Sequence, residues 1–318
     1  MSLQVLPAPG SSAPSAVRHF EKSARGRRAL GHFQSLLRYA AYPLLLVAAA
    51  VIATLAIALH WTLPLVNFTF VIGAFCYLAL LERLIPYDRS WHPEAWEWRR
   101  DGLYYLITFV TGGVARAAVL SIGMLIAPLQ TSIPLWAEIP AAIAIISLCS
   151  FSFHRLGHHH PWLWKVHGIH HVPEKVNVSN NNVVQFIDVF GNLFLTQLPL
   201  LLLGFSQPAV FAAIIFKSAQ GYGVHANIDV KLGWLSYVLV TPEQHRLHHS
   251  ADTREAGHYA ADLTIWDLLF GSFTWSPGKA PARVGVEDPA CFPPARSILA
   301  SQKHPFRRRI GGKEFARR

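Results

Sequence analysis

Long stretches of this chain carry no charged side chain, and these stretches predict its helices. Residues 39–61 form the first such run, and at about 1.5 Å per residue a helix of this length crosses a hydrocarbon layer of about 30 Å. Residues 65–81 form a second run, residues 103–129 a third that Arg116 interrupts, and residues 139–153 a shorter fourth. Buried helices of soluble proteins rarely run so long without charge. We therefore predict about four transmembrane helices.

A further apolar stretch, residues 189–216, is interrupted in its middle by a segment that contains Gly204 and Pro208. Glycine and proline break helices, so this pattern predicts two short helices in a re-entrant or interfacial hairpin, which enters and leaves by one face of the membrane. A single kinked span is the alternative. The chain shows no internal repeat of the kind that builds solenoids.

The composition agrees with a membrane protein. Of 318 residues, 52% are hydrophobic and only 14% are charged, and the mean hydropathy is +0.29. Residues 6–16 are rich in proline, serine and alanine, which is typical of a disordered tail, and the first apolar run begins too late and is too long for a cleavable signal. Cys76, Cys149 and Cys291 are widely separated, so they predict neither a disulfide framework nor a metal motif.

The net charge of +10 is concentrated in the tails and in short loops beside the apolar runs. Such cations suit anionic lipid headgroups, and they are not interleaved with aromatic residues, so we expect no nucleic-acid partner. Because positive residues stay on the cytoplasmic side, both termini and the site that follows the fourth span are expected there, in a bacterial inner membrane or an endoplasmic-reticulum-like membrane. The basic residues used for this orientation are Arg18, Lys22, Arg25, Arg27, Arg28, Arg38, Arg83, Arg89, Arg99, Arg100, Arg307, Arg308, Arg309, Lys313, Arg317 and Arg318.

Histidines gather after the fourth run, where 12 of the 17 lie between His154 and His258. Residues three and four apart share one face of a helix, so a box with this spacing directs its imidazoles to one side. Neutral imidazole suits iron, zinc, copper and nickel, and eight or more such groups are too many for one ion. A site for two transition-metal ions is therefore predicted from three boxes, His154-x3-His158, His167-x2-His170-His171 and His245-x2-His248-His249.

The spacing also separates neighbouring histidines. His170 and His171 differ by about 100° around a helix, so we expect each to bind a different ion. His159 and His160 leave the face of the first box and are expected not to be ligands. His225 stands alone between the boxes, on the same side of the membrane, and is expected to join the site.

Further polar residues follow the boxes. Thr241 is expected to cap a helix that starts just before His245. Carboxylates often accept the outer N–H of a ligating imidazole, so acids such as Asp252 are candidates for that role, although solvated loop acids are an equally good interpretation. The residues expected to bind metal or to support its ligands are His258, Asp262, Asp267 and Asn227.

The order of the motifs HRLGH, HGIHH, HAN, TPEQHRLHHS and HYAADLTIWDLLFGSF resembles the fatty acid hydroxylase / sterol desaturase superfamily of integral membrane di-metal oxygenases, over roughly residues 99–273. The resemblance implies a di-iron centre with O2 as cosubstrate and an external electron donor. The implied ligands are His154, His158, His167, His170, His171, His225, His245, His248 and His249.

Two departures from the family pattern stand out. Members often show Asn-Tyr-Gly where this chain has His258-Tyr259-Ala260, so His258 is a candidate for an extra ligand or a supporting residue. Many members carry Arg-x-His-Pro-x-Glu after the second box, where this chain has a run of asparagines. We expect that run to help shape a substrate channel through Asn181, Asn182 and Gln185.

These observations predict an O2-dependent monooxygenase that hydroxylates, or alternatively desaturates, an unactivated C–H bond of a fatty acyl, sterol or other isoprenoid lipid. A ferredoxin-like or cytochrome-like carrier with its reductase is the expected electron source. A membrane zinc hydrolase is the first alternative, weakened by the lack of a His-Glu-x-x-His helix. A non-catalytic metal carrier is the second.

The predicted fold is all-α. It begins with a basic, disordered cytoplasmic tail (residues 1–38) and transmembrane helices (residues 39–153). A cytoplasmic helical histidine-box domain follows (residues 154–275), which includes the membrane hairpin (residues 189–216). A proline-rich, basic carboxyl-terminal tail (residues 276–318) ends the chain.

Overall fold

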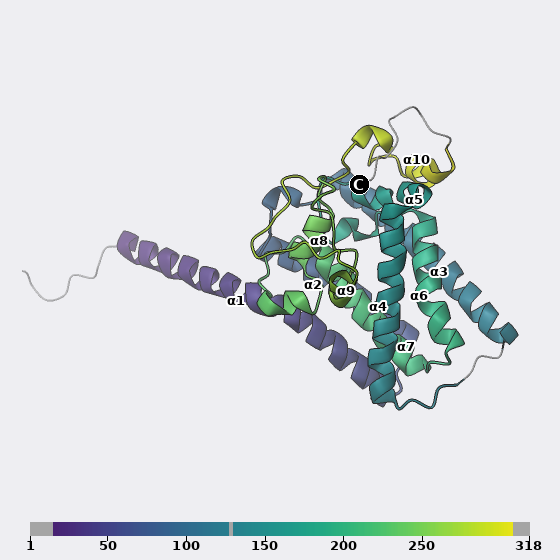
Figure 1. Cartoon of the computed structure of the whole chain (residues 1–318). Helices are drawn as coiled ribbons and strands as arrows, with labels where there is room; N and C mark the ends of the chain where they lie inside the picture. Colours follow the sequence, from purple (N-terminus) through teal and green to yellow (C-terminus); the bar gives the residue numbers. More distant parts are fainter. Residues whose placement is uncertain (1–14, 127–129, 308–318) are drawn as a thin grey trace, which may run out of the picture.

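The computed structural model describes residues 15–126 and 130–307, and nearly all of its regular structure is helical (Figure 1). Within these residues there is no β-sheet, only three isolated bridges. The α-helices are α1 (Ser15–Ala58), α2 (Leu63–Leu84), α3 (Ala95–Ile126), α4 (Leu135–His159), α5 (Pro161–His171), α6 (Phe186–Leu202), α7 (Gln207–His225), α8 (Pro242–His248), α9 (Ile265–Leu269) and α10 (Ile298–Lys303). Short 3-10 turns are η1 (Arg89–Trp91), η2 (Ser179–Asn182), η3 (Gly233–Tyr237), η4 (Pro289–Cys291) and η5 (His304–Phe306).

Four helices are long and apolar enough to cross a membrane, as the sequence predicts: Gly31–Ala58 of α1, and α2, α3 and α4 over their whole lengths. Their outward faces are hydrophobic, with side chains such as Leu44, Val47, Phe109 and Val110 more than half exposed. In a soluble protein such faces would be unfavourable, whereas hydrocarbon accommodates them. The all-α, polytopic prediction is confirmed to this extent.

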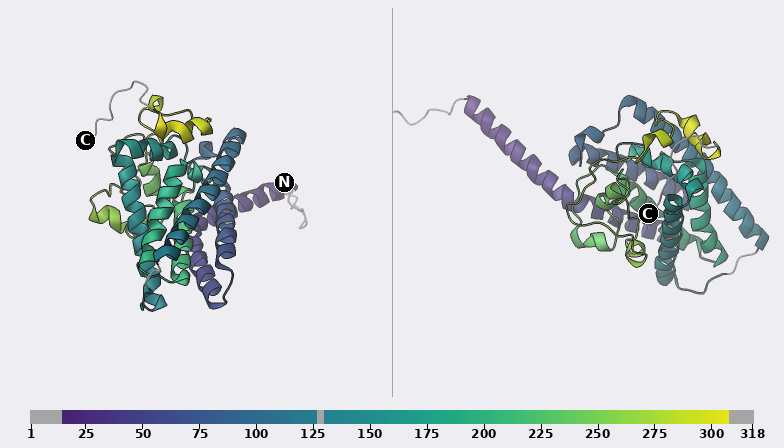
Figure 2. Two further views of the ribbon diagram at one scale, coloured as in Figure 1. Left: turned by 90° about the vertical axis from the view of Figure 1, so that its right-hand side faces the viewer. Right: turned by 45° about the horizontal axis from the view of Figure 1, so that its top comes forward.

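The amino-terminal segment is drawn as part of the first helix. Residues 1–14 lie outside the described residues, and so does most of the segment rich in proline, serine and alanine at residues 6–16. Helix α1 is continuous from Ser15. The helix thus extends into residues 15–38, for which the disordered tail stays a prediction. No proline interrupts the chain between Ala16 and Arg38, although Gly26 and Gly31 are poor helix formers, so the helix can continue the adjoining span. The first part of α1 projects from the bundle (Figure 2).

The predicted hairpin corresponds to α6 and α7. Both helices pack against α4, and the turn between them, with Gly204 at φ 75°, is fixed by the Glu138 carboxylate, which accepts hydrogen bonds from the backbone N–H and the hydroxyl of Ser206. Glu138 lies in the first turn of α4, whereas the first histidine box occupies its last turn. The turn is thus at one end of α4 and the free ends of the hairpin are at the other, beside the boxes. The helices have 17 and 19 residues, longer than expected, because α7 continues to His225.

The core of the bundle lies where α7 packs against α1 and α2. Small residues on α1, among them Ala49 and Ala53, let the helices approach closely, and larger side chains such as Phe70 and Leu78 fill the remaining space. Inside the bundle, the Tyr42 hydroxyl donates to the side chain of Gln220 on α7. The packing fixes the carboxyl end of α7, which carries His225.

A cap covers the carboxyl ends of α4 and α7. It contains α5, α8, α9 and the segment from residue 276 to residue 307, which is packed against the boxes (Figures 1 and 2). Gly285 N donates to His249 O at 3.0 Å, and Phe292 lies so close to Gly168 that a Cβ atom there would meet its ring at 2.4 Å. The carboxyl-terminal basic residues from Arg308 onwards lie outside the described residues.

Candidate metal centre

Nine histidines from four helices form two adjoining clusters at this end of the bundle. Within each cluster, one nitrogen from every ring lies within 4.8 Å of the corresponding nitrogens of the others. The five-histidine cluster contains His154, His158, His167, His171 and His248. The four-histidine cluster contains His170, His225, His245 and His249. The structure thus brings together every histidine that the boxes and the HAN motif nominated.

Helical geometry decides which box member joins which cluster. His170 and His171 are adjacent, and they turn to different clusters, as their angular separation predicts. The third box is divided in the same way, between His248 in one cluster and His245 and His249 in the other. The clusters adjoin where the rings of His171 and His249 stack, with centroids 4.4 Å apart.

The helix of the third box begins as predicted. Thr241 caps α8 through a capping box with Gln244, and Pro242 occupies the first turn. His245 and His249 are one turn apart on this helix, and their Nε2 atoms lie 3.1 Å from each other. The corresponding Nε2 atoms of His167 and His171 on α5 are 3.2 Å apart. In both pairs the rings point to a common position.

The outer nitrogens of three rings face backbone carbonyl oxygens. Nδ1 of His154 lies 2.5 Å from Tyr259 O, Nδ1 of His225 lies 2.8 Å from Asn177 O, and Nδ1 of His248 lies 2.9 Å from Gly257 O. A carbonyl oxygen can only accept, so each Nδ1 must carry the proton in the neutral ring. The Nε2 lone pair is then left for the interior of the cluster. These contacts select the tautomer that a metal ion needs.

The inward nitrogens fit a metal ion. The Nε2 atoms of His154, His158, His225 and His248 are buried and have no hydrogen-bond partner in the described residues. Buried polar atoms are almost always satisfied, and lone pairs that converge without a proton donor between them are costly unless a cation lies there. The donor set is entirely imidazole nitrogen, which suits iron or another first-row transition metal and excludes calcium or magnesium.

Burial also keeps these rings neutral. It lowers the pKa of His248 to about 3 and that of His225 to about 4, from an ordinary histidine value near 6.5. The pKa values of His171, His245 and His249 are likewise lowered well below that value, by burial first and by neighbouring imidazoles second. Near neutral pH the rings are therefore in the form that binds metal without displacing a proton.

One supporting residue was missed by the sequence analysis. The Asp188 carboxylate lies 2.8 Å from His167 Nδ1 and accepts a charge-assisted hydrogen bond from its N–H. Asp188 lies in the first turn of α6, where Gln185 caps the helix. Its signal was a lone acid next to the long apolar stretch that starts at residue 189.

The acids nominated from the sequence have other partners. Asp267 accepts hydrogen bonds from the backbone N–H groups of Tyr259 and Ala260, so it holds the loop whose Tyr259 carbonyl faces His154. Asp262 accepts from the Ser147 hydroxyl inside the bundle. Asp252 forms an exposed ion pair with Arg254. Of the three, Asp267 is tied to the clusters, indirectly.

His258 and Asn227 are not members of either cluster. His258 Nε2 accepts from Thr274 N at 3.0 Å, and its backbone adopts φ 60°. Asn227 is fully buried. Its backbone N–H donates to the Glu82 carboxylate, and its side-chain amide donates to Asp88 O. Asn227 therefore joins the loop after α2 to the loop after α7.

The three channel candidates lie between α5 and α6. Asn182 donates to the Tyr222 hydroxyl at 3.1 Å, and the Tyr222 ring stacks on Tyr105. Gln185 is buried and caps α6, and its amide donates to Gln302 O. Asn181 is half-buried in η2. Among the three candidates, Asn182 is thus joined by its hydrogen bond to Tyr222 of α7.

Comparison with known proteins gives consistent results. The family model of fatty acid hydroxylases matches residues 139–272, which span both clusters. The ornithine lipid hydroxylase OlsE of Rhizobium tropici is 32% identical over 253 residues, covering 75% of this chain and 74% of that protein. Alkylglycerol monooxygenases of Danio rerio and Homo sapiens are 35% and 32% identical over 124 residues, which is 38% of this chain but only 27% of their own length. No solved structure matches.

Proposed function

The chain belongs to the fatty acid hydroxylase family, and we propose that it is an O2-dependent membrane di-iron oxygenase that hydroxylates an unactivated C–H bond of a lipid. Members with this similarity are named as lipid hydroxylases and monooxygenases, so the chain is an oxidoreductase. The observation that carries the proposal is the pair of adjoining all-imidazole clusters in a bundle with four helices long enough to cross a membrane.

Each cluster would hold one iron. The five-histidine cluster offers five nitrogens and the four-histidine cluster four, so with six-coordinate ions the first would have one open position and the second would have two. When bound and reduced by an external donor, a pair of irons supplies the means to activate O2 and to oxidise a C–H bond.

The protein itself positions the imidazole rings and excludes bulk water from the clusters. Peptide carbonyls and the Asp188 carboxylate fix the rings, so little reorganisation is needed when metal binds. Burial of His171, His248 and His249 keeps bulk water from the clusters, which protects a reactive oxidant from side reactions. The clusters lie at the ends of α4 and α7, so a lipid carbon can reach them from the hydrocarbon layer while electrons arrive from the aqueous side.

Three details extend the proposal. Asn182, with Tyr222 and Tyr105, lines the route of the lipid, since Tyr222 lies one turn before the cluster member His225. The histidine-box end is cytoplasmic, because basic Arg38 is tied to it through Asp229. An acidic ferredoxin-like or cytochrome-like carrier supplies the electrons at this basic face.

Hydroxylation is preferred to desaturation because the similar proteins are named hydroxylases or monooxygenases. Zinc hydrolysis is a poorer fit, since a hydrolytic zinc site needs three protein ligands and a carboxylate base, whereas these clusters supply nine imidazoles and no carboxylate ligand. A metal carrier would place ligands along a path through the spans. The clusters instead adjoin at one end of the bundle.

The test combines metal analysis with isotope labelling. The full chain, purified in detergent with iron and reconstituted with a reductant, should contain about two irons. When cells carrying it are grown under ¹⁸O2, lipid mass spectrometry should show a hydroxyl group that contains the label. A chain that binds zinc alone, or one whose lipid products carry oxygen from water, would contradict the proposal.

A further inference from the structure

A charged cavity lies beside the five-histidine cluster, at the start of α3. Its volume is about 340 Å³, and it is enclosed by the first turns of α3, residues 172–175 after the second box and residues 283–295 of the carboxyl-terminal segment. Its charged and aromatic walls include Glu94, Trp96, Glu97, Arg100, Lys175 and Arg283. The described contacts leave one of these groups unsatisfied.

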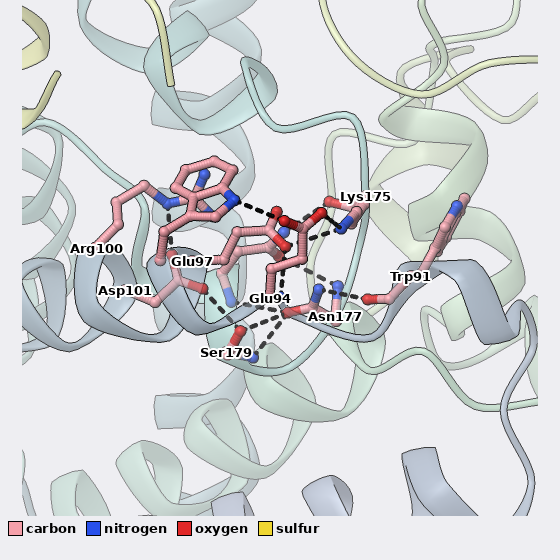
Figure 3. Close-up of polar contacts among 10 residues, drawn as sticks. Trp91, Glu94, Glu97, Arg100, Asp101, Lys175, Asn177 and Ser179 are labelled. Carbon is pink, nitrogen blue, oxygen red and sulfur yellow. Dashed lines mark hydrogen bonds and ion pairs between the residues drawn. The ribbon is translucent and has the colours of Figure 1, made fainter. Parts of the chain in front are cut away.

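Three acidic residues line the cavity, Glu94, Glu97 and Glu174, and Lys175 pairs with the first two. Lys175 Nζ lies 2.8 Å from the carboxylate of Glu97 and 3.6 Å from that of Glu94 (Figure 3). Glu94 also accepts a hydrogen bond from the Trp96 indole, and Glu97 accepts one from the backbone N–H of Glu94. The carboxylates of Glu94 and Glu97 are thus held by contacts with Lys175, Trp96 and the backbone.

The basic wall is not neutralised in the same way. Arg100 is only 4% exposed; its Nε donates to Asp101 at 2.7 Å, while its Nη2 atom is buried without any acceptor in the described residues. Asp101 is itself held in place, because its other oxygen accepts from the Ser179 hydroxyl at 2.8 Å (Figure 3). It cannot turn to serve Nη2 without losing that bond. A buried guanidinium nitrogen without an acceptor is a strong site for an anion.

Neighbouring groups add to the positive charge. The guanidinium groups of Arg100 and Arg296 both approach the Trp96 indole, at 5.0 Å and 4.4 Å from its centroid. Arg283 donates to the carbonyl of Val286. It forms no ion pair with a carboxylate of the described residues. Of these three guanidinium groups, Arg100 is the one with an ion pair among the described residues, to Asp101.

The position of the cavity relates it to both the membrane and the metal centre. It opens at the first turns of α3, one of the four helices long enough to cross a membrane, where Trp96 and the exposed Trp98 are typical of headgroup depth. Val172, which lines the cavity, directly follows the cluster member His171, about 3.8 Å further along the backbone. An amphiphile with its head here lies beside the clusters.

We propose that this cavity binds the acidic group, phosphate or carboxylate, of the lipid substrate's head, with Arg100 as the buried anchor and Arg283 at the exposed mouth. The inference rests on the proposed lipid hydroxylation and adds a substrate class to it: a lipid with an anionic group in its head. The guanidinium fork matches the paired oxygens of either group.

The test measures binding, so it does not depend on turnover. Dihexanoyl phosphatidic acid, dihexanoylglycerol and inorganic phosphate are titrated by calorimetry into the full chain in neutral detergent. The phosphatidic acid should bind at least about ten-fold more tightly than either of the others, because it alone combines the anion with acyl chains. Arg100→Gln should abolish this preference, whereas Arg99→Gln, which removes an exposed charge from the neighbouring position, should leave it intact.

Several results would overturn the assignment. Unchanged binding of phosphatidic acid to Arg100→Gln is one, and inorganic phosphate that binds as tightly as the lipid, which would mark a free-anion site, is another. Slower reduction of Arg100→Gln by an acidic carrier with unchanged lipid binding would assign the cavity to the carrier instead. If Arg100→Gln does not fold, Arg283→Gln at the exposed mouth serves in its place, and full retention of the preference in it also overturns the proposal.

The two proposals fail in different ways. If phosphatidic acid binding depends on Arg100 but no lipid gains oxygen, the cavity assignment stands and the proposed hydroxylation is wrong. If lipids are hydroxylated with an unchanged KM in Arg100→Gln, the hydroxylation stands and the cavity assignment is wrong.

Discussion

The two histidine clusters are built from the same kinds of residue, but they are supported differently. In the five-histidine cluster, the outer nitrogens of His154, His167 and His248 face Tyr259 O, a carboxylate and Gly257 O. In the four-histidine cluster, His225 faces Asn177 O, whereas the Nδ1 atom of His245 is buried without a partner in the described part of the chain. The first cluster has one more ligand and a more fully fixed frame.

This difference suggests that one cluster binds its ion more tightly and that the other is more accessible to O2. Outer partners orient ligands and raise their basicity, so the five-histidine cluster should keep its ion more firmly. The four-histidine cluster has fewer donors and more freedom, and so it is the better place for O2 to find an open position. The asymmetry gives the predictions that follow.

The largest effect is expected from His249→Ala, which leaves three donors in the four-histidine cluster. Iron should fall from about two per chain to about one, and hydroxylated lipid should disappear, because the weaker site loses a quarter of its ligands. Metal analysis and lipid mass spectrometry measure both. His159→Ala is the control, since that ring is exposed and outside both clusters. Two irons in His249→Ala, or their loss in His159→Ala, would contradict the ligand assignment.

His171→Ala should cost less metal, because four donors remain in its cluster, as many as the other cluster has when intact. Product formation should still fall at least roughly 100-fold, since the rings of His171 and His249 stack where the clusters adjoin. The comparison is the iron content of the two variants, measured side by side. Greater iron loss from His171→Ala than from His249→Ala would reverse the proposed asymmetry.

Asp188→Ala should weaken metal binding at the five-histidine cluster by roughly 10-fold to 100-fold, because His167 loses the partner that fixes its tautomer. Asp188→Asn keeps an acceptor oxygen and should be milder. Competition with a chelator measures the affinities, and Asp252→Asn, at an exposed ion pair, is the control. Equal affinities for Asp188→Ala and the intact chain would show that the carboxylate has no supporting role.

The smallest effect concerns the loop that supports His248 through the Gly257 carbonyl. Burial, together with the smaller effect of the Lys279 charge, lowers the pKa of the neighbouring His258 to about 4. The unfolded chain, with a histidine pKa near 6.5, binds this proton more readily, so stability that is present above about pH 6.5 is lost as the pH falls towards 4. At pH 5 the loss is about 2 kcal/mol.

His258→Asn removes this titration, and asparagine tolerates the positive φ of the position. The free energy of unfolding of the intact chain, taken relative to that of the variant, should therefore fall by about 2 kcal/mol between pH 7 and pH 5. Denaturant titrations in detergent at both pH values measure it. A difference that does not change with pH would show that His258 is not buried as a neutral ring.

The sequence predicted the parts of the fold and site that depend on local periodicity. Uncharged runs gave the four long helices, and helical spacing placed His170 and His171 in different clusters. The cap at Thr241 was also local and was predicted. These features need only a few neighbouring residues, so one sequence contains enough information to infer them.

The partners of the clusters could not be predicted in this way. Asp188 was missed although it is close in space to His167, and Asp262 was nominated because it is close in sequence to the third box. The carbonyls that fix the tautomers belong to every sequence and carry no side-chain signal. Their positions come from the packing of α4, α6 and α7, which depends on contacts between distant residues.

The most direct test of the account locates the metal itself. Crystals of the full chain loaded with iron should give two peaks in an anomalous difference map recorded at the iron edge, one within the five-histidine cluster and one within the four-histidine cluster. A single peak, or iron bound away from these nine imidazoles, would contradict the account.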